Sequence, residues 1–447
     1  MEQDCKIRRN RTRETSLNSD GLLYRGIKNL LRCDEAEVVE GIARYVISQH
    51  RSLRVVSRFV KRTRKTPIPA LMTLMAWTRS FLVVCPSGPL HGIAWIARLS
   101  NERRAIESLI AVDSDLDCTE LKFQSRISLR DALTITVKNL KSIPRIYKIA
   151  RRLHLRFEPF KAMRVIELLG YYTRYIELFS RANFNLALTS NHSNPHGIAF
   201  NLAAQRCGIP VVLISHGMPV RPVARLKYAL AVVHCEAASQ IYRDEGCQIE
   251  RLLTHGRKDD YVPIRNGPLP TQINVGIFLC KDVNELLLMT LVANLLANKR
   301  VTRICVRPHP KNLWRHMDPW IASLRDERLS RSHASTVAND MKGLHLTFGG
   351  NSSVLIEAVT AGIPSAYVDG LDHGPMDVHG FVAAGLIYQS PVDPNLDDIR
   401  RFYERPDWSR TLQKFANIEE DEATVMANTV KGIVDIRRAC KPSIVGQ

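Results

Sequence analysis

Short apolar runs alternate with segments of helical periodicity along most of the chain. The clearest strand candidates in the first half are residues 184–190 and 211–214, on either side of a helix predicted over 199–206. The second half predicts strands at 273–280, 304–306, 344–348 and 365–368, and helices at 284–297 and 354–362. Strands that alternate with helices indicate parallel sheets covered by helices on both faces, so we expect an α/β protein.

The region around residue 100 follows the same alternation in our prediction. The apolar pattern predicts a strand at 81–85, a helix over 93–109, a second strand at 108–117 and a mainly helical segment over 129–179. Asp113-Ser114-Asp115 ends the second of these strands, and paired carboxylates can hold a divalent ion. We interpret this sequence as a polar strand end, because the stronger nucleotide-binding pattern lies far downstream.

The first 75 residues predict a helical extension that is strongly basic. Residues 35–48 have apolar positions spaced for an amphipathic helix. A run of cations without acidic residues follows: Arg51, Arg54, Arg58, Lys61, Arg62, Arg64 and Lys65. Such a run is consistent with a solvated helical face, contact with a membrane surface or contact with nucleic acid. No zinc finger, RNP-like aromatic motif or repeat accompanies the charge, which disfavours nucleic acid.

Composition bounds the possible partners and the compartment. The chain has 447 residues, which predicts two domains plus appendages, and a formal net charge of +19 favours anionic partners. Its ten cysteines form no CxxC pair, so we expect reduced thiols and neither a disulfide framework nor a zinc site. The N-terminal sequence lacks an apolar signal core, and the longest apolar stretch is interrupted, so we expect a cytoplasmic protein without a spanning helix.

Residues 307–364 carry the strongest chemical signal. His309 follows the predicted strand 304–306, at the edge where open α/β sheets bind ligands, and Arg307 precedes it. Asn351, Ser352 and Ser353 stand at the start of the predicted helix 354–362, where exposed amides and hydroxyls suit phosphate oxygens. Glu357, one turn further along, could accept hydrogen bonds from ribose hydroxyls. A turn and a simple helix cap are the structural alternatives.

This order of motifs resembles the donor half of GT-B glycosyltransferases. A His-Pro pair, then a Ser-Ser pair at a helix start, then Glu-Ala and Gly-Ile-Pro, is similar to the pattern in bacterial sialyl- and polysialyltransferases and in CDP-glycerol glycerophosphotransferases. The resemblance implies that His309 and Ser352 or Ser353 hold the phosphate of the leaving nucleotide. It also implies two Rossmann-like domains that face a central cleft.

Two residues compete for the role of catalytic base. Ser215-His216-Gly217-Met218-Pro219 resembles the His-Gly-Thr-Pro sequence of glycerophosphotransferases, which implies that His216 takes the proton of the acceptor hydroxyl, although Met218 replaces the usual threonine. Asp244-Glu245-Gly246 resembles the acidic motif that supplies the base in bacterial sialyltransferases, which implies Glu245 instead. The structural alternatives are a hydrogen-bonded loop for His216 and a helix that ends at Gly246 for Glu245.

Domain boundaries follow from the linkers. We predict the basic extension at 1–75, an acceptor-side Rossmann-like domain at 76–265 and a donor-binding domain at 273–447. The Gly-Arg turn within 252–263 resembles the end of the first domain in these transferases, and residues 419–438 are predicted to return across the domain junction. Residues 369–379 contain Asp369, Asp372, His373, Asp377 and His379, but their spacing fits no standard metal pattern, so we expect a loop that lines the cleft.

The resemblance implies transfer of a sugar from a CMP- or CDP-type donor to a capsule, lipopolysaccharide or related surface glycan. Inversion by direct displacement without a metal or other cofactor is expected, because fixed hydrogen-bond donors can stabilise the leaving phosphate. We expect a lipid-linked or growing glycan as acceptor and peripheral contact with an anionic membrane, with residues 1–65 dispensable for turnover of a soluble acceptor. The alternatives are a CDP-glycerol-type polyol-phosphate transferase, a sugar-nucleotide epimerase and a non-enzymatic nucleic-acid-binding protein.

Overall fold

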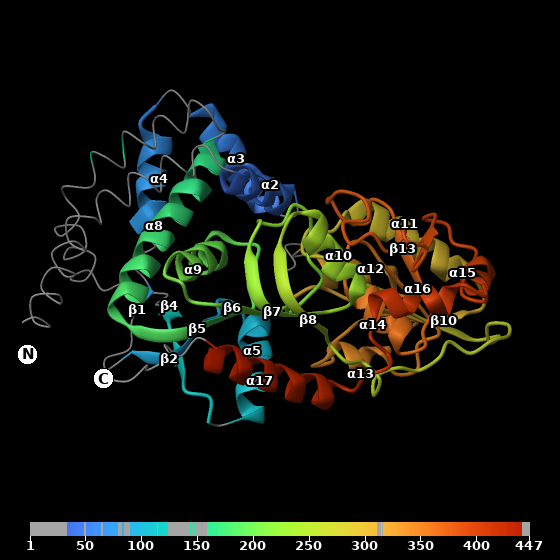
Figure 1. The fold of residues 1–447 in the computed structure, drawn as a ribbon. Coiled ribbons are helices and arrows are strands. Elements are labelled where there is room, and N and C mark those ends of the chain that lie inside the picture. Colours follow the sequence, from blue (N-terminus) through green and yellow to red (C-terminus); the bar gives the residue numbers. More distant parts are fainter. Residues whose placement is uncertain are drawn as a thin grey trace, which may run out of the picture.

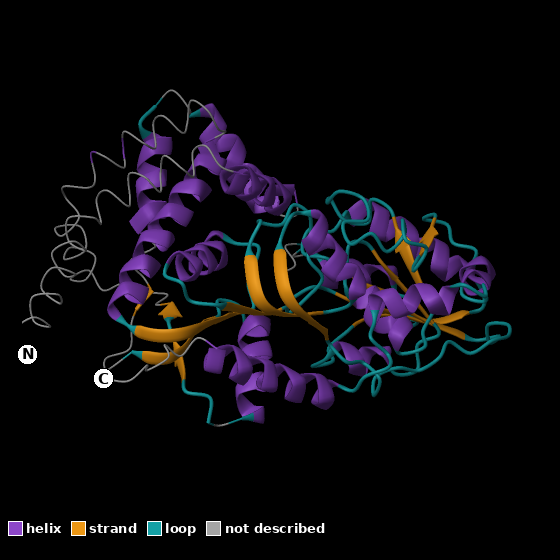
Figure 2. Cartoon of the chain, in the orientation of Figure 1, coloured by secondary structure: helices purple, strands orange, loops and turns teal. Residues whose placement is uncertain are grey.

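Two six-stranded parallel sheets form the frame of the protein (Figure 1). The computed structural model describes residues 34–48, 51–63, 66–78, 83–84, 90–113, 115–123, 144, 147, 159–310, 314 and 316–439. Helices lie on the faces of both sheets, as Figure 2 shows. The predicted fold class, two Rossmann-like domains with a helical N-terminal extension, is confirmed by this arrangement.

The first sheet has the strand order β3-β2-β5-β6-β7-β8. Its strands are β2 (His91–Ile96), β3 (Cys118–Glu120), β5 (Asn183–Thr189), β6 (Val211–Ile214), β7 (Lys227–Val233) and β8 (Gln248–Thr254). All neighbours pair in parallel, and the chain reverses its direction of travel across the sheet between β2 and β5. Ligands of open α/β sheets bind at such a switch point, at the carboxyl ends of the strands.

The second sheet has the order β11-β10-β9-β12-β13-β14. Its strands are β9 (Ile273–Phe278), β10 (Val301–Arg307), β11 (Leu329–Arg331), β12 (Leu346–Gly349), β13 (Ser365–Val368) and β14 (Tyr388–Ser390). Numbered from β9, this is the order 3-2-1-4-5-6 of dinucleotide-binding folds, with its switch point between β9 and β12. The strands predicted from 273 onward are confirmed, whereas β11 and β14 were not predicted.

Helices from three parts of the chain cover the first sheet. The helices α8 (Pro159–Arg181) and α9 (Pro195–Arg206) lie on one face, and α5 (Ser100–Val112) and α17 (Glu422–Ala439) lie on the other (Figure 1). The helix α9 begins where the Asn194 side chain accepts the Gly197 N–H at 2.9 Å. On the second face, Ile106 of α5 and Ile433 of α17 share a buried apolar cluster with strand residues.

The remaining helices belong to all three parts of the chain. In the first domain, α10 (Glu236–Asp244) joins β7 to β8. The second-domain helices are α11 (Glu285–Ala297), α12 (Met317–Leu324), α13 (Val337–Met341), α14 (Val354–Thr360), α15 (Leu396–Phe402) and α16 (Trp408–Phe415). The extension forms α2 (Asp34–Ser48), α3 (Arg51–Arg62) and α4 (Ile68–Thr78), which pack against α8. Within the described residues, no helix has the length and apolarity needed to cross a membrane.

Predictions between residues 81 and 117 are right in part. The described residues of the predicted strand 81–85 form β1 (Val83–Val84), which pairs with β4 (Lys122–Phe123) outside the main sheets. The predicted helix 93–109 is wrong at its start, which forms the buried strand β2, and right from Ser100, where α5 begins. The predicted strand 108–117 is wrong, because its first residues are the end of α5. Short apolar runs fit a buried strand and a buried helix equally well, so periodicity alone could not separate them.

Other predictions for the first domain, and the prediction for the cysteines, have mixed outcomes. The Asp115 N–H donates to Asp113 Oδ1 at 3.0 Å just after α5, so these carboxylates follow a helix and not a strand, and Ser114 lies outside the described residues. Of the predicted helical segment 129–179, the part from 159 onward is α8, and most of the rest lies outside the described residues. The strands β7 and β8 were not predicted. The six described cysteines are free thiols, as predicted for them.

The predicted return of residues 419–438 to the first domain is confirmed. The Arg257 N–H donates to the Asn417 carbonyl at 2.7 Å, and the helix α17 then packs against α5, β7 and β8. A Cβ on Gly256 would lie 2.4 Å from the Asp421 main chain, so only glycine permits this close approach. The chain therefore crosses between the domains twice, although the exact domain boundaries stay a prediction.

Candidate active site

A cavity of about 430 Å³ lies at the switch point of the second sheet, and we call it the donor pocket because it contains the residues predicted to bind a donor. Its walls come from the loops after β9, β10 and β12 and from the helix α2. The lining includes Lys281, Arg307, His309, Asn351, Ser352, Ser353 and His379, together with Tyr45 and Val46. The structure therefore brings together the His-Pro and Ser-Ser motifs that the sequence analysis singled out.

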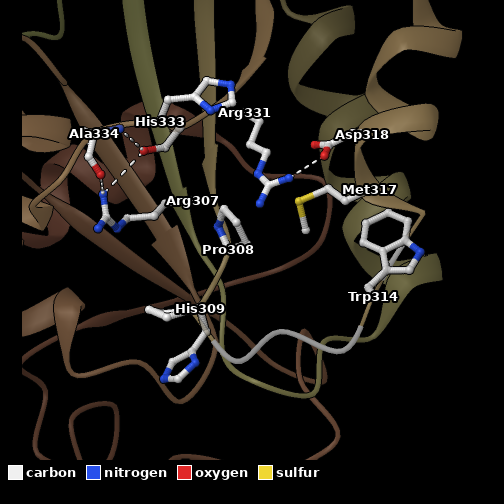
Figure 3. Close-up of a pocket in the computed structure, with 11 residues that line it drawn as sticks. Arg307, Pro308, His309, Trp314, Met317, Asp318, Arg331, His333 and Ala334 are labelled. Carbon is white, nitrogen blue, oxygen red and sulfur yellow. Dashed lines mark hydrogen bonds and ion pairs between the residues drawn. The ribbon is translucent and has the colours of Figure 1, made fainter. Parts of the chain in front are cut away.

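His309 lies between the donor pocket and a neighbouring cavity. That second cavity, of about 440 Å³, is lined by residues that follow β10 and β11, and by Trp314, Met317 and Asp318. In Figure 3 the His309 ring and the Arg307 guanidinium point in different directions from the end of β10. His309 can therefore present its imidazole to a ligand in the donor pocket, whereas Arg307 is directed toward residues 332–340.

Arg307 has a structural function that the sequence analysis did not predict. Its Nη1 donates to the carbonyls of Ala334 at 3.1 Å and Thr336 at 3.2 Å, and it forms an ion pair with Asp340 (Figure 3 shows the contact with Ala334). The Ser332 hydroxyl donates to the same carboxylate. Because this guanidinium nitrogen is already shared among several acceptors, the side chain fixes the loop beside His309.

The three residues before α14 have different surroundings. The Asn351 N–H donates to Asp372 Oδ2 at 2.6 Å, and its side-chain amide bonds with Asp372 Oδ1 and with the main chain of Pro375 and Val378. Ser353 is the N-cap of α14 but makes no capping hydrogen bond with its side chain. Asn351 thus holds the loop in place, whereas the Ser352 hydroxyl accepts the Val354 N–H at 3.4 Å and both serines line the pocket.

Glu357 lies outside the donor pocket lining. Burial raises its pKa, and the guanidinium groups of Arg257 and Arg307 act in the opposite direction. Arg257 belongs to the turn that follows the first sheet, so Glu357 faces the junction of the two domains. A contact with ribose, as predicted for Glu357, stays a prediction.

A third cavity, of about 280 Å³, lies at the switch point of the first sheet, and we call it the acceptor pocket because it contains His216, the predicted base for an acceptor. The loops after β2, β5 and β6 form it, and residues of α2 and the second-domain residue Lys281 complete it. Its polar lining includes Glu102, Arg164, Asn191, His192, His216 and Arg221. Tyr45, Val46 and Lys281 line both this pocket and the donor pocket, so the two cavities meet at one junction.

The hydrogen bonds of His216 suit a base. The Ser190 carbonyl lies 2.6 Å from His216 Nδ1 and must accept a hydrogen bond from it, so Nδ1 carries the proton in the neutral ring. The second nitrogen, Nε2, is then left with a lone pair. His192 beside it is buried, with its Nδ1 at hydrogen-bond distance, 2.9 Å, from the Tyr242 hydroxyl, and burial lowers its pKa to about 3. His192 therefore stays neutral and is a poor proton acceptor.

Glu245 and His216 lie at opposite edges of the first sheet. The strand β8 begins at Gln248 beside Lys227, the first residue of β7, so the Glu245-Gly246 turn lies at the edge where strands begin. His216 follows the end of β6, at the opposite edge. Arg221 pairs with Asp244 at 2.5 Å and lies 3.7 Å from Glu245, and Glu245 does not line the acceptor pocket. The structure does not bring the two candidate bases together.

Three lining residues were absent from the predicted site. Tyr45 belongs to the extension, and Lys281 follows a strand without any recognisable motif. His379 belongs to the loop 369–379, which lines the donor pocket as predicted. Burial lowers the pKa of His379 to about 4, so its ring is neutral. Among the described residues no group of three His, Cys, Asp or Glu side chains is arranged to hold a metal ion.

The sequence matches no known protein family and no curated protein. Solved structures similar to it include MnaA with UDP from S. aureus, with 11% identity over 78% of this chain and 97% of the other and a TM-score of 0.43. MurG from Acinetobacter baumannii shows 11% identity over 78% and 100%, with a TM-score of 0.41. The wall teichoic acid polymerase TagF shows 12% identity over 86% and 98%, with a TM-score of 0.41.

Further similar structures carry the names glycosyltransferase and UDP-GlcNAc 2-epimerase. Because all of these TM-scores lie below 0.5, the fold is assigned from the strand orders of the two sheets and not from the matches. The enzyme class, the donor, the acceptor and the mechanism are therefore argued from the site.

Proposed function

We propose that the protein is a metal-independent glycosyltransferase that uses a nucleotide-activated donor, with CMP or CDP as the leaving nucleotide. The observation that carries this proposal is the junction of two cavities: one holds His309, Ser352 and Ser353, and the other holds His216. A nucleotide diphosphate or monophosphate suits the first cavity, because hydroxyls, main-chain amides and an imidazole there can bind phosphate oxygens. A hydroxyl-bearing acceptor suits the second.

The proposed reaction is a direct displacement. His216 Nε2 takes the proton of the acceptor hydroxyl while the acceptor oxygen forms a bond to the anomeric carbon of the donor. The bond between that carbon and the phosphate oxygen breaks, and the electron pair leaves with the phosphate. His309, Ser352 and Ser353 stabilise the growing negative charge by hydrogen bonds. Attack opposite the leaving group inverts the anomeric centre.

A thermal-shift screen with CMP, CDP, UMP, UDP and GDP tests the donor site. A ligand at a hundred times its dissociation constant is expected to add about 2.7 kcal/mol to the free energy of unfolding. His309→Ala is expected to reduce the shift, whereas His316→Ala, at an exposed position of the same domain, leaves it unchanged. No shift with any nucleotide contradicts the proposal.

A second measurement separates transferase from epimerase. NMR of a donor built on the nucleotide that gives the thermal shift, incubated with the enzyme without acceptor, shows an epimerised sugar only if the protein is an epimerase. A transferase is expected to leave the sugar configuration of the intact donor unchanged and to release free nucleotide slowly, through attack by water.

A further inference from the structure

The helix α2 forms one wall of the junction between the two pockets. Its residues Tyr45 and Val46 line both pockets, and its residues Val39, Ile42 and Ala43 line the acceptor pocket. Figure 1 shows α2 at the top of the view, between α8 and the second domain. A segment that sequence patterns place outside both domains therefore contributes directly to the cavity surface.

The acceptor side holds α2 closely. A Cβ on Gly41 would lie 2.4 Å from Pro222 Cγ, so the helix backbone touches the loop that follows His216. Pro222 itself lines the acceptor pocket. The ammonium group of Lys161 on α8 pairs with Glu40 of α2, and both side chains are largely buried. The position of α2 over the acceptor pocket is therefore fixed by apolar contact and by an ion pair.

The second domain holds the following helix, α3. Arg54 forms an ion pair with Asp282, whose side chain is only 4% exposed, and Arg51 lies 3.2 Å from Glu285. Asp282 directly follows Lys281, the charged residue that lines both pockets. The helices α2 and α3, which we call the arm, thus join the first domain to the loop at the junction.

We propose that Tyr45 contacts the transferred group of the donor at this junction, and that the arm excludes water from it. This inference rests on the proposed function, because it requires a group to pass from the donor pocket to the acceptor pocket. Sugars and polyols present hydroxyls to which a phenol can donate a hydrogen bond. Burial raises the pKa of Tyr45, so its hydroxyl keeps the proton that it donates.

Exclusion of water matters for the chemistry of the junction. A water molecule beside the transferred carbon can attack it in place of the acceptor hydroxyl, which yields free sugar and nucleotide instead of a glycosidic bond. Val46 and the apolar side chains of Val39 and Ile42 offer no hydrogen-bond partners to such a water molecule. The arm is therefore expected to favour transfer over hydrolysis.

The test uses the full-length protein and three variants. The donors are UDP-GlcNAc, CDP-glycerol and CMP-sialic acid, and nucleotide release is measured with and without acceptor for the donor that the wild-type protein uses. Tyr45→Phe removes only the hydroxyl, Tyr45→Ala also removes the ring, and Arg44→Ala changes an exposed position on the same helix. Calorimetry with the leaving nucleotide of that donor measures the donor pocket separately.

Tyr45→Phe is expected to lower kcat for transfer about tenfold, the effect of one lost hydrogen bond to the reacting group, while nucleotide affinity stays unchanged. Tyr45→Ala is expected to raise the share of donor lost to hydrolysis, and Arg44→Ala to behave as wild type. Wild-type transfer and hydrolysis in both Tyr45 variants would overturn the inference and leave the proposed function intact. Absence of nucleotide binding in the wild-type protein would overturn the proposed function and this inference with it.

Discussion

The donor and acceptor pockets are built in different ways. The donor pocket takes its motif residues from loops of one sheet, after β10 and β12, and those residues lie close together in the sequence. The acceptor pocket combines loops after β2, β5 and β6 with α2 and with Lys281 of the other domain. The motif residues of the donor pocket therefore leave a recognisable linear pattern, whereas the acceptor pocket, and the α2 wall that both pockets share, exist only after distant segments have packed together.

The largest expected effect is a loss of kcat on substitution of His216, which we compare with a loss of nucleotide affinity on substitution of His309. His216→Ala is expected to lower kcat about 10²- to 10⁴-fold, because the general base is lost, and to leave nucleotide affinity unchanged. His309→Ala is expected to weaken nucleotide binding and also to slow transfer. Calorimetry with the nucleotide found in the thermal-shift screen and one rate assay measure both effects.

Glu245→Gln is the matched control for the base. Because Glu245 lies at the opposite edge of the first sheet, near-normal turnover is expected for this variant. If His216→Ala keeps its turnover and Glu245→Gln loses it, the base is Glu245. The acceptor would then bind near the turn after α10 and not in the pocket that contains His216.

The next effect concerns the contact between the arm and the second domain. Arg54→Ala leaves the buried Asp282 carboxylate without its cation and is expected to cost about 3 kcal/mol of unfolding free energy. Arg51→Ala removes an exposed pair with Glu285 and is expected to cost less than about 1 kcal/mol. Urea denaturation of the two variants checks this difference, and equal costs would show that the buried pair does not anchor the arm.

A pH dependence is expected from the buried histidines of the first domain. Burial lowers the pKa of His196 to about 3, so the folded protein leaves this ring neutral at pH values where the unfolded chain protonates it. Through His196, the free energy of unfolding is therefore highest above pH 6.5. Between pH 6.5 and pH 3 it falls by about 1.4 kcal/mol for each pH unit of acidification. His192 has the same direction of shift.

Denaturation between pH 6 and pH 4 measures this slope. The pair of substitutions His196→Phe and Tyr175→Phe removes the ring together with the hydroxyl that bonds to it, and is expected to reduce the slope. His316→Asn, at an exposed site of the second domain, is the control. An unchanged slope in the double variant would show that His196 is not kept neutral by its burial.

The smallest effect concerns the outer surface of the extension, outside both pockets. Phe59 of α3 is 52% exposed and Met75 of α4 is 69% exposed, and the exposed cations Lys61 and Arg62 follow Phe59 on α3. We propose that this surface contacts an anionic membrane, where each cation contributes about 1 kcal/mol. Lys61→Glu with Arg62→Glu is expected to lower binding to phosphatidylglycerol vesicles, measured by sedimentation, and to spare turnover of a soluble acceptor.

This pair of substitutions replaces the deletion of residues 1–65 that the sequence suggests. Because α2 lines both pockets, that deletion would remove part of the site together with the basic surface. Equal vesicle binding by the double variant and the wild-type protein would contradict membrane contact through α3.

Local patterns were sufficient for most of the second domain. The strand β9, the helix α11 with its Asn284 cap and the helix α14 all lie close to their predicted positions. Clear stop signals also mark the ends of two elements in this domain, Pro308 after β10 and Gly362 after α14, so these ends were decided within a few residues. The buried runs near residue 100 lacked such signals, and there the predictions were right only in part.

The sequence by itself determined the alternating α/β plan, the donor motif around His309 and Ser352, and the histidine at the end of β6, because each depends on neighbours along the chain. Only the tertiary structure decided that Arg307 bonds to Asp340, that Glu245 lies away from the acceptor pocket, and that Tyr45 reaches the junction. These depend on strand order and on the docking of α2 between the domains. Such contacts join residues far apart in sequence, whose proximity no local pattern encodes.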